Sequence, residues 1–306
     1  ILVHAEQGLG DTIHFARLIG QVAARGGRVV FEVQPELLRL MRGLEGVAEL
    51  VERGAELPRF DCHSPLLSLP RSLGLRVNTI PAQAPYLAAE PALAERWRTL
   101  RRAGCRHIGL VWAGNASHAN DANRSIALAK LAPLAGIQNV EWFSLQKGSA
   151  ARQAPPAGLN LRDLAPELHD FAGTAAAIVN FDLVITVDTA VAHLAGALGV
   201  PVWVLLPHSP DWRWLLDRDD SPWYPMRLFR QSAPGDWDGV FARVVENLAP
   251  ATAEAARGPD PSRLRHRAVV RSVADRGPVG SARVDRRRLH PRRLGRARSR
   301  LRRHGA

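Results

Sequence analysis

Short apolar runs separated by amphipathic stretches recur along the first 250 residues. The clearest case lies at residues 181–206. The β-branched run at 183–186 predicts a buried parallel strand, and apolar side chains at helical spacing predict a helix from Asp188 or Thr189 that ends at Gly199. Residues 202–206 predict a second buried strand. This segment therefore predicts one βαβ unit.

The same alternation of strands and helices occurs twice along the chain, which predicts an α/β fold with two doubly wound, Rossmann-like domains facing a cleft. Strands are expected at residues 1–5, 29–33, 47–51, 107–111, 140–145, 159–161, 183–186, 202–206 and 226–229. Further helices are expected from Asp11 as a cap, from Pro35, at 93–103, from Ser125 as a cap to Leu134, at 170–179 and at 237–248. Residues 55–90 are expected to form loops and short helices.

Three segments follow from this pattern: a first domain at residues 1–104, a second at 105–250, and a tail at 251–306. The tail contains Arg and Pro without an apolar period, so it cannot bury enough surface to offset its ordering entropy and is predicted to be disordered. The net charge of +12 belongs to it, since residues 257–306 hold 17 Arg and three Asp. Because the tail has no aromatic residues to stack on bases, we do not expect it to bind nucleic acid specifically.

Composition narrows the setting of the protein. Two cysteines, Cys62 and Cys105, provide neither a disulfide framework nor a metal quartet, which favours the cytoplasm. No apolar run reaches the length of a membrane span. The chain begins without Met, on an apolar strand, so we interpret it as a fragment whose first domain is truncated at its N-terminus.

One candidate for chemistry in the first domain is Asp11, in the turn after the first strand. Two glycines precede it, but Ile13 stands where a dinucleotide-binding fingerprint needs a third. A carboxylate at a helix entrance opposes phosphate binding and suits a base that accepts a proton from a hydroxyl. A plain helix cap is the alternative.

Candidates in the second domain follow the carboxyl ends of its strands. The helix that starts near Thr189 is a possible anion site, with Ala190 and His193 in its first turns, although most βαβ units bind no ligand. Arg124 or Lys147 could neutralise a phosphate. The alternative for Arg124 is that it belongs to a solvated polar loop without a ligand. Residues 210–224 are rich in Trp, which is typical of sugar or base recognition and equally of loops anchored to a core. A D-x-D pattern at Asp217 is too short to predict a metal site.

Taken together, these motifs resemble the glycosyltransferase module at the C-terminus of bacterial tetratricopeptide-repeat proteins, which is related to the lipopolysaccharide heptosyltransferases. The resemblance runs over residues 1–249. Its motifs are EQGLGD at 6–11, SPLLSLP at 64–70, GLVWAGN at 109–115, FSLQKG at 143–148, VDTAVAHLAG at 187–196 and PDWRW at 210–214.

The resemblance implies a GT-B fold, with an acceptor-binding first domain and a nucleotide-sugar-binding second domain, and an enzyme without a metal or other cofactor. It places the catalytic base at Asp11. The donor's diphosphate and sugar fall on the second domain, where Ala190 replaces the family's usual Gly and Arg124 stands in for a missing Lys. The expected donor residues are Asn115, Arg124, Gln146, Lys147, Asp188, Thr189, Ala190 and His193, and the expected acceptor or sugar residues are Gln7, Gly10, Asp211 and Trp212.

The expected activity is transfer of a sugar from a nucleotide diphosphate donor to a hydroxyl of a glycan, protein or lipid-linked acceptor. Tetratricopeptide repeats are possible upstream partners. The alternative is a non-catalytic carbohydrate- or protein-binding module derived from such an enzyme.

Overall fold

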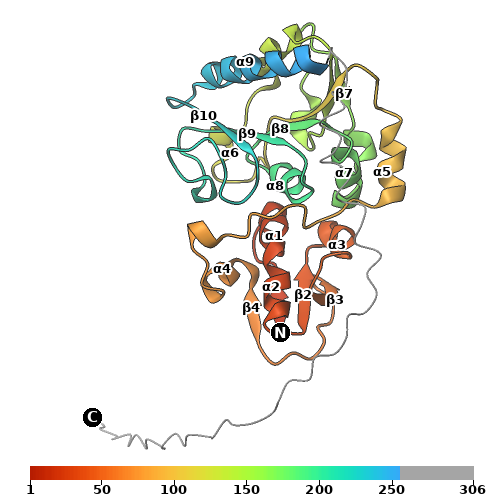
Figure 1. The fold of residues 1–306 in the computed structure, drawn as a ribbon, viewed down its shortest axis with the longest axis vertical. Coiled ribbons are helices and arrows are strands. Elements are labelled where there is room, and N and C mark those ends of the chain that lie inside the picture. Colours follow the sequence, from red (N-terminus) through yellow and green to blue (C-terminus); the bar gives the residue numbers. More distant parts are fainter. Residues whose placement is uncertain (256–306) are drawn as a thin grey trace, which may run out of the picture. The chain divides into compact units, whose positions relative to one another are not determined.

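The computed structural model describes residues 1–255, which form two separate sheets in which every strand pair is parallel (Figure 1). The first sheet has the order β3-β2-β1-β4. Its strands are β1 (Leu2–His4), β2 (Val29–Val33), β3 (Val47–Glu52) and β4 (His63–Pro65). The helices of this half are α1 (Leu9–Phe15), α2 (Ile19–Ala24), α3 (Pro35–Met41) and α4 (Leu69–Ser72). The next helix along the chain, α5 (Pro91–Arg98), packs instead against the second half, on the helix at Phe171–Ile178.

The second sheet has the order β10-β9-β8-β5-β6-β7. Its strands are β5 (Arg106–Val111), β6 (Val140–Ser144), β7 (Leu161–Asp163), β8 (Leu183–Val187), β9 (Val202–Leu206) and β10 (Arg227–Arg230). Its α-helices are α6 (Asp121–Arg124), α7 (Phe171–Ile178), α8 (Ala190–Ala197) and α9 (Trp237–Ala255), and its 3-10 segments include η4 (Leu128–Gly136), η6 (Ala165–Glu167) and η7 (Trp212–Trp214). The predicted boundary at residue 104 falls between α5 and β5.

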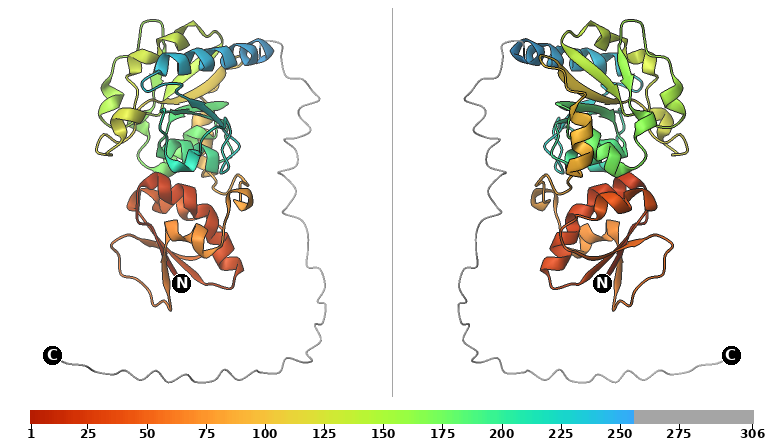
Figure 2. Two further views of the ribbon diagram at one scale, coloured as in Figure 1. Left: turned by 90° about the vertical axis from the view of Figure 1, so that its left-hand side faces the viewer. Right: turned by 90° about the vertical axis from the view of Figure 1, so that its right-hand side faces the viewer.

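Alternate residues of the central strand β8 enter different cores, as the two-residue period of a strand requires. Val184 belongs to the cluster that contains the apolar face of α8, whereas Ile185 and Val187 join the cluster formed with α9 and η4. Helices therefore cover both faces of the second sheet, which Figure 2 shows with α9 and α8 on opposite sides. This two-sided burial explains why β8 is apolar along its whole length.

The two halves meet where α1 packs against α8 (Figure 1). A Cβ atom added at Gly10 would lie 3.2 Å from the Cα of Ala190 and 3.2 Å from Cδ2 of His193. A single apolar cluster accordingly includes residues of both helices. The small residues in these two helices therefore serve close helix–helix approach.

Most predicted elements are confirmed, and several details differ from the predictions. Asp11 does not cap its helix, because Gly8 is the N-cap and Asp11 is the third helical residue. Ser125 does not start a helix through Leu134; its hydroxyl is used inside the preceding loop, and Pro133 keeps the segment 3-10 helical. The strand β4 was not predicted, since it is short, polar and at the sheet edge.

The final helix extends to Ala255, so the first residues of the predicted tail are helical. The remainder of the predicted disordered tail, residues 256–306, lies outside the described residues. Within residues 1–255, each helix is too short or too polar to span a bilayer.

Candidate active site

Asp11 lies at the N-terminal end of α1, where its carboxylate is held at both oxygens. Oδ2 accepts a hydrogen bond from the Gly8 amide at 2.9 Å, the reciprocal half of a capping box. Oδ1 accepts from the guanidinium of Arg213, which belongs to the other half of the molecule. The side chain is 20% exposed, so one edge of it can still meet a ligand.

Arg213 connects two carboxylates, because its other terminal nitrogen donates to Oδ1 of Asp211 at 2.8 Å. Asp211 also caps η7 by accepting the backbone amide of Arg213 at 3.0 Å. The guanidinium carbon lies 4.9 Å from the ring centre of Trp212, a cation–π distance. Trp212 is 59% exposed and lies beside Phe15 of α1. The predicted residues Asp11, Asp211 and Trp212 are thus brought together by Arg213.

The N-terminus of α8 lies next to this cluster. Thr189 is the N-cap, and its hydroxyl is 3.0 Å from that of Thr186 rather than on a helix amide. The contact of Gly10 with Ala190 and His193 brings the residue before Asp11 against the first turn of α8. The first amides of a helix have no partners within the helix and favour anions. A carboxylate and the N-terminus of a helix therefore border one site.

Two histidines are buried where α1 packs on α8. The ring of His193 is stacked on that of Trp214. The ring centre of His14 lies 4.7 Å from the ring centre of His193. Both ring nitrogens of His14 and Nδ1 of His193 are buried without a hydrogen-bond partner. Burial, followed by the positive charges of Arg213 and Arg17, lowers the pKa of His193 to about 3. Burial also places the pKa of His14 well below its usual value, so both rings are neutral near pH 7.

Asp188 and Arg124 meet through the backbone. The guanidinium of Arg124 donates to the carbonyl oxygen of Asp188 at 3.1 Å and is paired with Asp121 at 3.3 Å. Burial, with the nearby carboxylate of Asp211, raises the pKa of Asp188, and the charges of Arg124 and Arg213 oppose that shift. Arg124 therefore holds the start of α8 in place and keeps a positive charge close to it.

Gln146 and Lys147, at the end of β6, are used by the protein itself. The amide of Gln146 accepts from the backbone of Trp112 and Ala113 at 3.0 and 2.9 Å, and donates to the carbonyls of Ala113 and Lys147. The ammonium of Lys147 donates to the carbonyls of residues 165 and 168, at 2.8 and 2.7 Å. Both side chains thus shape the loops at this end of the sheet.

Asn115 and Gln7, the remaining predicted residues, are exposed loop residues at the ends of β5 and β1. The side chain of Asn115 accepts from the amide and hydroxyl of Ser117, and the carbonyl of Gln7 accepts from the side chain of Gln34. Their carboxyl-end positions agree with the rule for ligand sites in parallel sheets. Neither side chain makes a contact with the Asp11 cluster among the hydrogen bonds of the described residues.

Two residues at this site were not predicted. Arg213 stands inside the PDWRW motif, but only its neighbours Asp211 and Trp212 were singled out there. His14 follows Asp11 by three residues, a spacing that places both on one face of a helix. This spacing could have identified His14. Arg213 and Asp11 are 202 positions apart, so no local sequence signal indicates their pairing.

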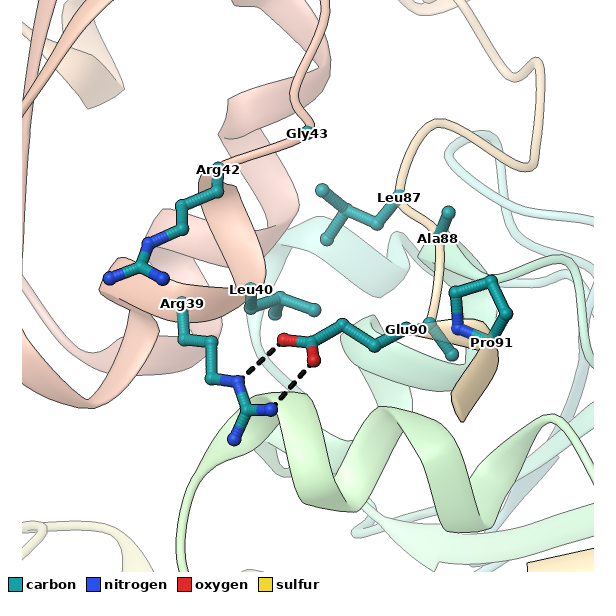
Figure 3. A pocket seen from close by; sticks show the side chains of 9 residues that line it. Arg39, Leu40, Arg42, Gly43, Leu87, Ala88, Glu90 and Pro91 are labelled. Atoms are coloured by element: carbon teal, nitrogen blue, oxygen red, sulfur yellow. Dashed lines mark hydrogen bonds and ion pairs between the residues drawn. The ribbon is translucent and has the colours of Figure 1, made fainter. Parts of the chain in front are cut away.

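Two cavities of the described residues lie away from this cluster. A cavity of about 600 Å³ is lined by α3 and the connection before α5, where Arg39 pairs with Glu90 at 2.5 Å (Figure 3). A second, of about 470 Å³, lies between β10 and α9. Chemistry rather than volume thus identifies the candidate site. Within residues 1–255, three or more His, Cys, Asp or Glu side chains do not gather in a metal-binding group.

Residues 127–214 match the model of a protein family described as glycosyltransferase family 9 (heptosyltransferase). That span includes α8 and the loop from Asp211 to Trp214, and it excludes Asp11. Protein FlbA of Caulobacter vibrioides is 26% identical over 281 residues, covering 81% of this chain and 46% of that protein. The chain therefore spans about half the length of this relative.

Two solved structures have a similar fold. A glycosyl transferase of family 9 from Veillonella parvula matches with a TM-score of 0.54 and 13% identity, over 75% of this chain and 85% of that one. The ADP-heptose lipopolysaccharide heptosyltransferase II of E. coli matches with a TM-score of 0.53 and 14% identity, over 83% and 98%. At such identity the likeness concerns the fold, and it confirms the predicted GT-B architecture. Residues 127–214 thus carry the sequence pattern of glycosyltransferase family 9, and the fold of the chain is similar to that of these two glycosyltransferases.

Proposed function

We propose that this protein transfers a sugar from a nucleotide diphosphate donor to a hydroxyl acceptor. The observation that carries the proposal is the approach of Gly10 to Ala190 and His193, which puts a part-exposed carboxylate beside the N-terminus of α8. One side of the site can then take up a proton while the other receives the negative charge of a leaving group.

On the acceptor side, Asp11 is the general base. Each of its oxygens accepts one hydrogen bond and keeps a further lone pair, so the carboxylate can accept the proton of an attacking hydroxyl. The exposed face of Trp212 lies beside it and provides a flat apolar surface for a sugar ring. Gln7, Gly10 and Asp211 border the same side.

On the donor side, the first amides of α8 bind the diphosphate that departs. Thr189 begins this helix, and Arg124 adds positive charge through its contact with the carbonyl of Asp188. Because the helix end and its cation are in place before the donor arrives, they stabilise the developing charge without reorganisation. The diphosphate needs no metal ion in this proposal.

The donor panel starts from ADP-heptose, the nucleotide sugar in the description of the E. coli relative. Acceptors to be tested are glycans, proteins and lipid-linked sugars, in a cytoplasmic setting. Upstream tetratricopeptide repeats are a candidate source of acceptor recognition.

The test combines binding with transfer. Titration calorimetry of residues 1–255 with nucleoside diphosphates and nucleotide sugars, in the presence of EDTA, should yield a saturable heat for one nucleotide. The variant Asp11→Asn should keep that binding and lose about 10²- to 10⁴-fold in transfer rate. The exposed Asp61→Asn, in the same half, is the matched control and should transfer normally.

Undiminished transfer by Asp11→Asn would show that another group is the base. If no nucleotide bound at all, the non-catalytic carbohydrate- or protein-binding module would be the better description. Transfer that stopped in EDTA and returned with a divalent cation would refute metal independence.

A further inference from the structure

Arg213 occupies an unusual position for a loop arginine. It is 9% exposed, and its two terminal nitrogens contact carboxylates from different halves of the molecule, Asp11 on α1 and Asp211 on its own loop. Nε is buried without a partner. Burying a cation is unfavourable unless opposite charges compensate it, so both carboxylates are needed to keep the guanidinium here.

The backbone that follows Arg213 is held in an uncommon conformation. Leu215 has φ 54° and Asp217 has φ 55°, and neither is glycine. Left-handed φ values at such residues are strained and persist where the surroundings fix them, often at functional sites. Here the indole of Trp223 donates to the carbonyl of Arg213 at 3.0 Å, which fixes the start of this turn.

The other cations of the donor side are engaged elsewhere. Arg124 is paired with Asp121 and the carbonyl of Asp188, and Lys147 is bound to two carbonyls near η6. Arg213 is the cation whose contact reaches Asp11. Its effect on the site is therefore exerted through that carboxylate.

We propose that Arg213 is a positioning residue, which orients the Asp11 carboxylate from the opposite half of the molecule. This inference rests on the proposed function and adds to it the device that aligns the base. The Gly8 amide and Arg213 hold one oxygen each, so the carboxylate cannot rotate about its Cβ–Cγ bond without losing a contact. The base is aligned only while the donor half lies against α1.

The size of the effect follows from the geometry of proton transfer. A misplacement of about 1 Å at a reacting group can reduce a rate about 10²-fold. Losing the guanidinium leaves Asp11 with its amide contact alone, and the carboxylate then samples orientations that do not face the acceptor. Donor binding at the start of α8 does not use this contact, so it should change little.

The experiment compares Arg213→Gln, Arg213→Lys and Arg218→Gln. Arg218 lies on the same loop, pairs with Asp220 at 2.6 Å and is the matched control. We expect Arg213→Gln to lower kcat about 10²-fold with the KM for donor within about threefold, since only orientation is lost. Arg213→Lys should restore part of kcat, and Arg218→Gln should behave as the unmodified chain.

A second measurement needs no substrate. Hydrogen exchange of the amides of residues 8–12 should become faster in Arg213→Gln than in Arg218→Gln, because α1 loses a contact at its first turn. Unaltered exchange together with unaltered kcat would overturn the inference, as would a large rise in donor KM at constant kcat. If the unmodified chain transferred no sugar, the proposed function would fail, while the exchange comparison would still decide whether Arg213 holds Asp11.

Discussion

The burial of His193 predicts a specific dependence of stability on pH. In the folded protein burial lowers the pKa of this ring from 6.5 to about 3, so the ring stays neutral in the fold over a range in which the unfolded chain takes up a proton. The unfolded state then binds more protons, and stability falls as the pH falls below 6.5. The contribution of the neutral ring is fully present above pH 6.5 and is lost progressively toward pH 3.

The magnitude follows from 1.36 kcal/mol for each pKa unit. Between pH 6.5 and pH 4.5 a single histidine of this kind costs about 2.3 kcal/mol of unfolding free energy, because the ring of the unfolded chain is already half protonated at pH 6.5. This change is large against a typical total stability of about 5–15 kcal/mol. His193 is 5% exposed, so solvent screening reduces it little.

The perturbation is His193→Phe, which keeps a planar ring against Trp214 and removes the titrating group. Urea unfolding, followed by tryptophan fluorescence between pH 4.5 and 8, gives the free energy of both chains. Any packing cost of the larger ring lowers the variant at every pH and leaves the slope unaffected. On going from pH 6.5 to 4.5, we expect the unfolding free energy of the unmodified chain to fall by about 2–3 kcal/mol more than that of the variant.

Parallel curves for the two chains would refute the reasoning, because they would show that His193 titrates alike in the folded and unfolded states. The charged and titratable groups near the ring are Arg213, Arg17, His14 and Tyr224. Asp188 has a raised pKa and stabilises the fold as the pH falls, and it is present in both chains, so the comparison removes it.

Two further variants test the packing around the site by the same unfolding measurement. Gly10→Ala should lower the unfolding free energy by about 1–3 kcal/mol, because its Cβ would meet the backbone of Ala190 at 3.2 Å. The control Gly43→Ala, with open space around it, should change stability little. Equal effects of the two variants would contradict the close approach of α1 to α8. Gln146→Leu should lower the unfolding free energy by about 2–4 kcal/mol, because it leaves buried backbone groups without hydrogen-bond partners. Its control is Gln138→Leu, at an exposed side chain. Unchanged stability of Gln146→Leu would show that the loop can provide other partners for those groups.

The elements of the sheet could be predicted from the sequence where burial is two-sided. Runs such as residues 183–187 and 202–206 are apolar and β-branched throughout, and the helices beside them begin and end at residues with a local preference, as at Asp170 and Gly199. Strand β4 could not be predicted, because its pairing with β1 rests on backbone hydrogen bonds that place no demand on its side chains.

The candidate site divides in the same way. The motif at residues 6–11 identified a carboxylate at a turn, and that at 187–196 identified a helix start, because both depend on local backbone geometry. The function of Gln146 and Lys147 as internal hydrogen-bond donors could not be predicted, since their partners are set by loops that fold over the sheet end.

By itself the sequence determined that two parallel α/β halves form and that Asp11 and Thr189 lie at strand carboxyl ends, because periodicity and turn chemistry are local properties. The tertiary structure decided that Gly10 packs on Ala190 and that Arg213 reaches Asp11. Those contacts join residues about 180 to 200 positions apart, and helix packing, rather than any spacing along the chain, brings them together.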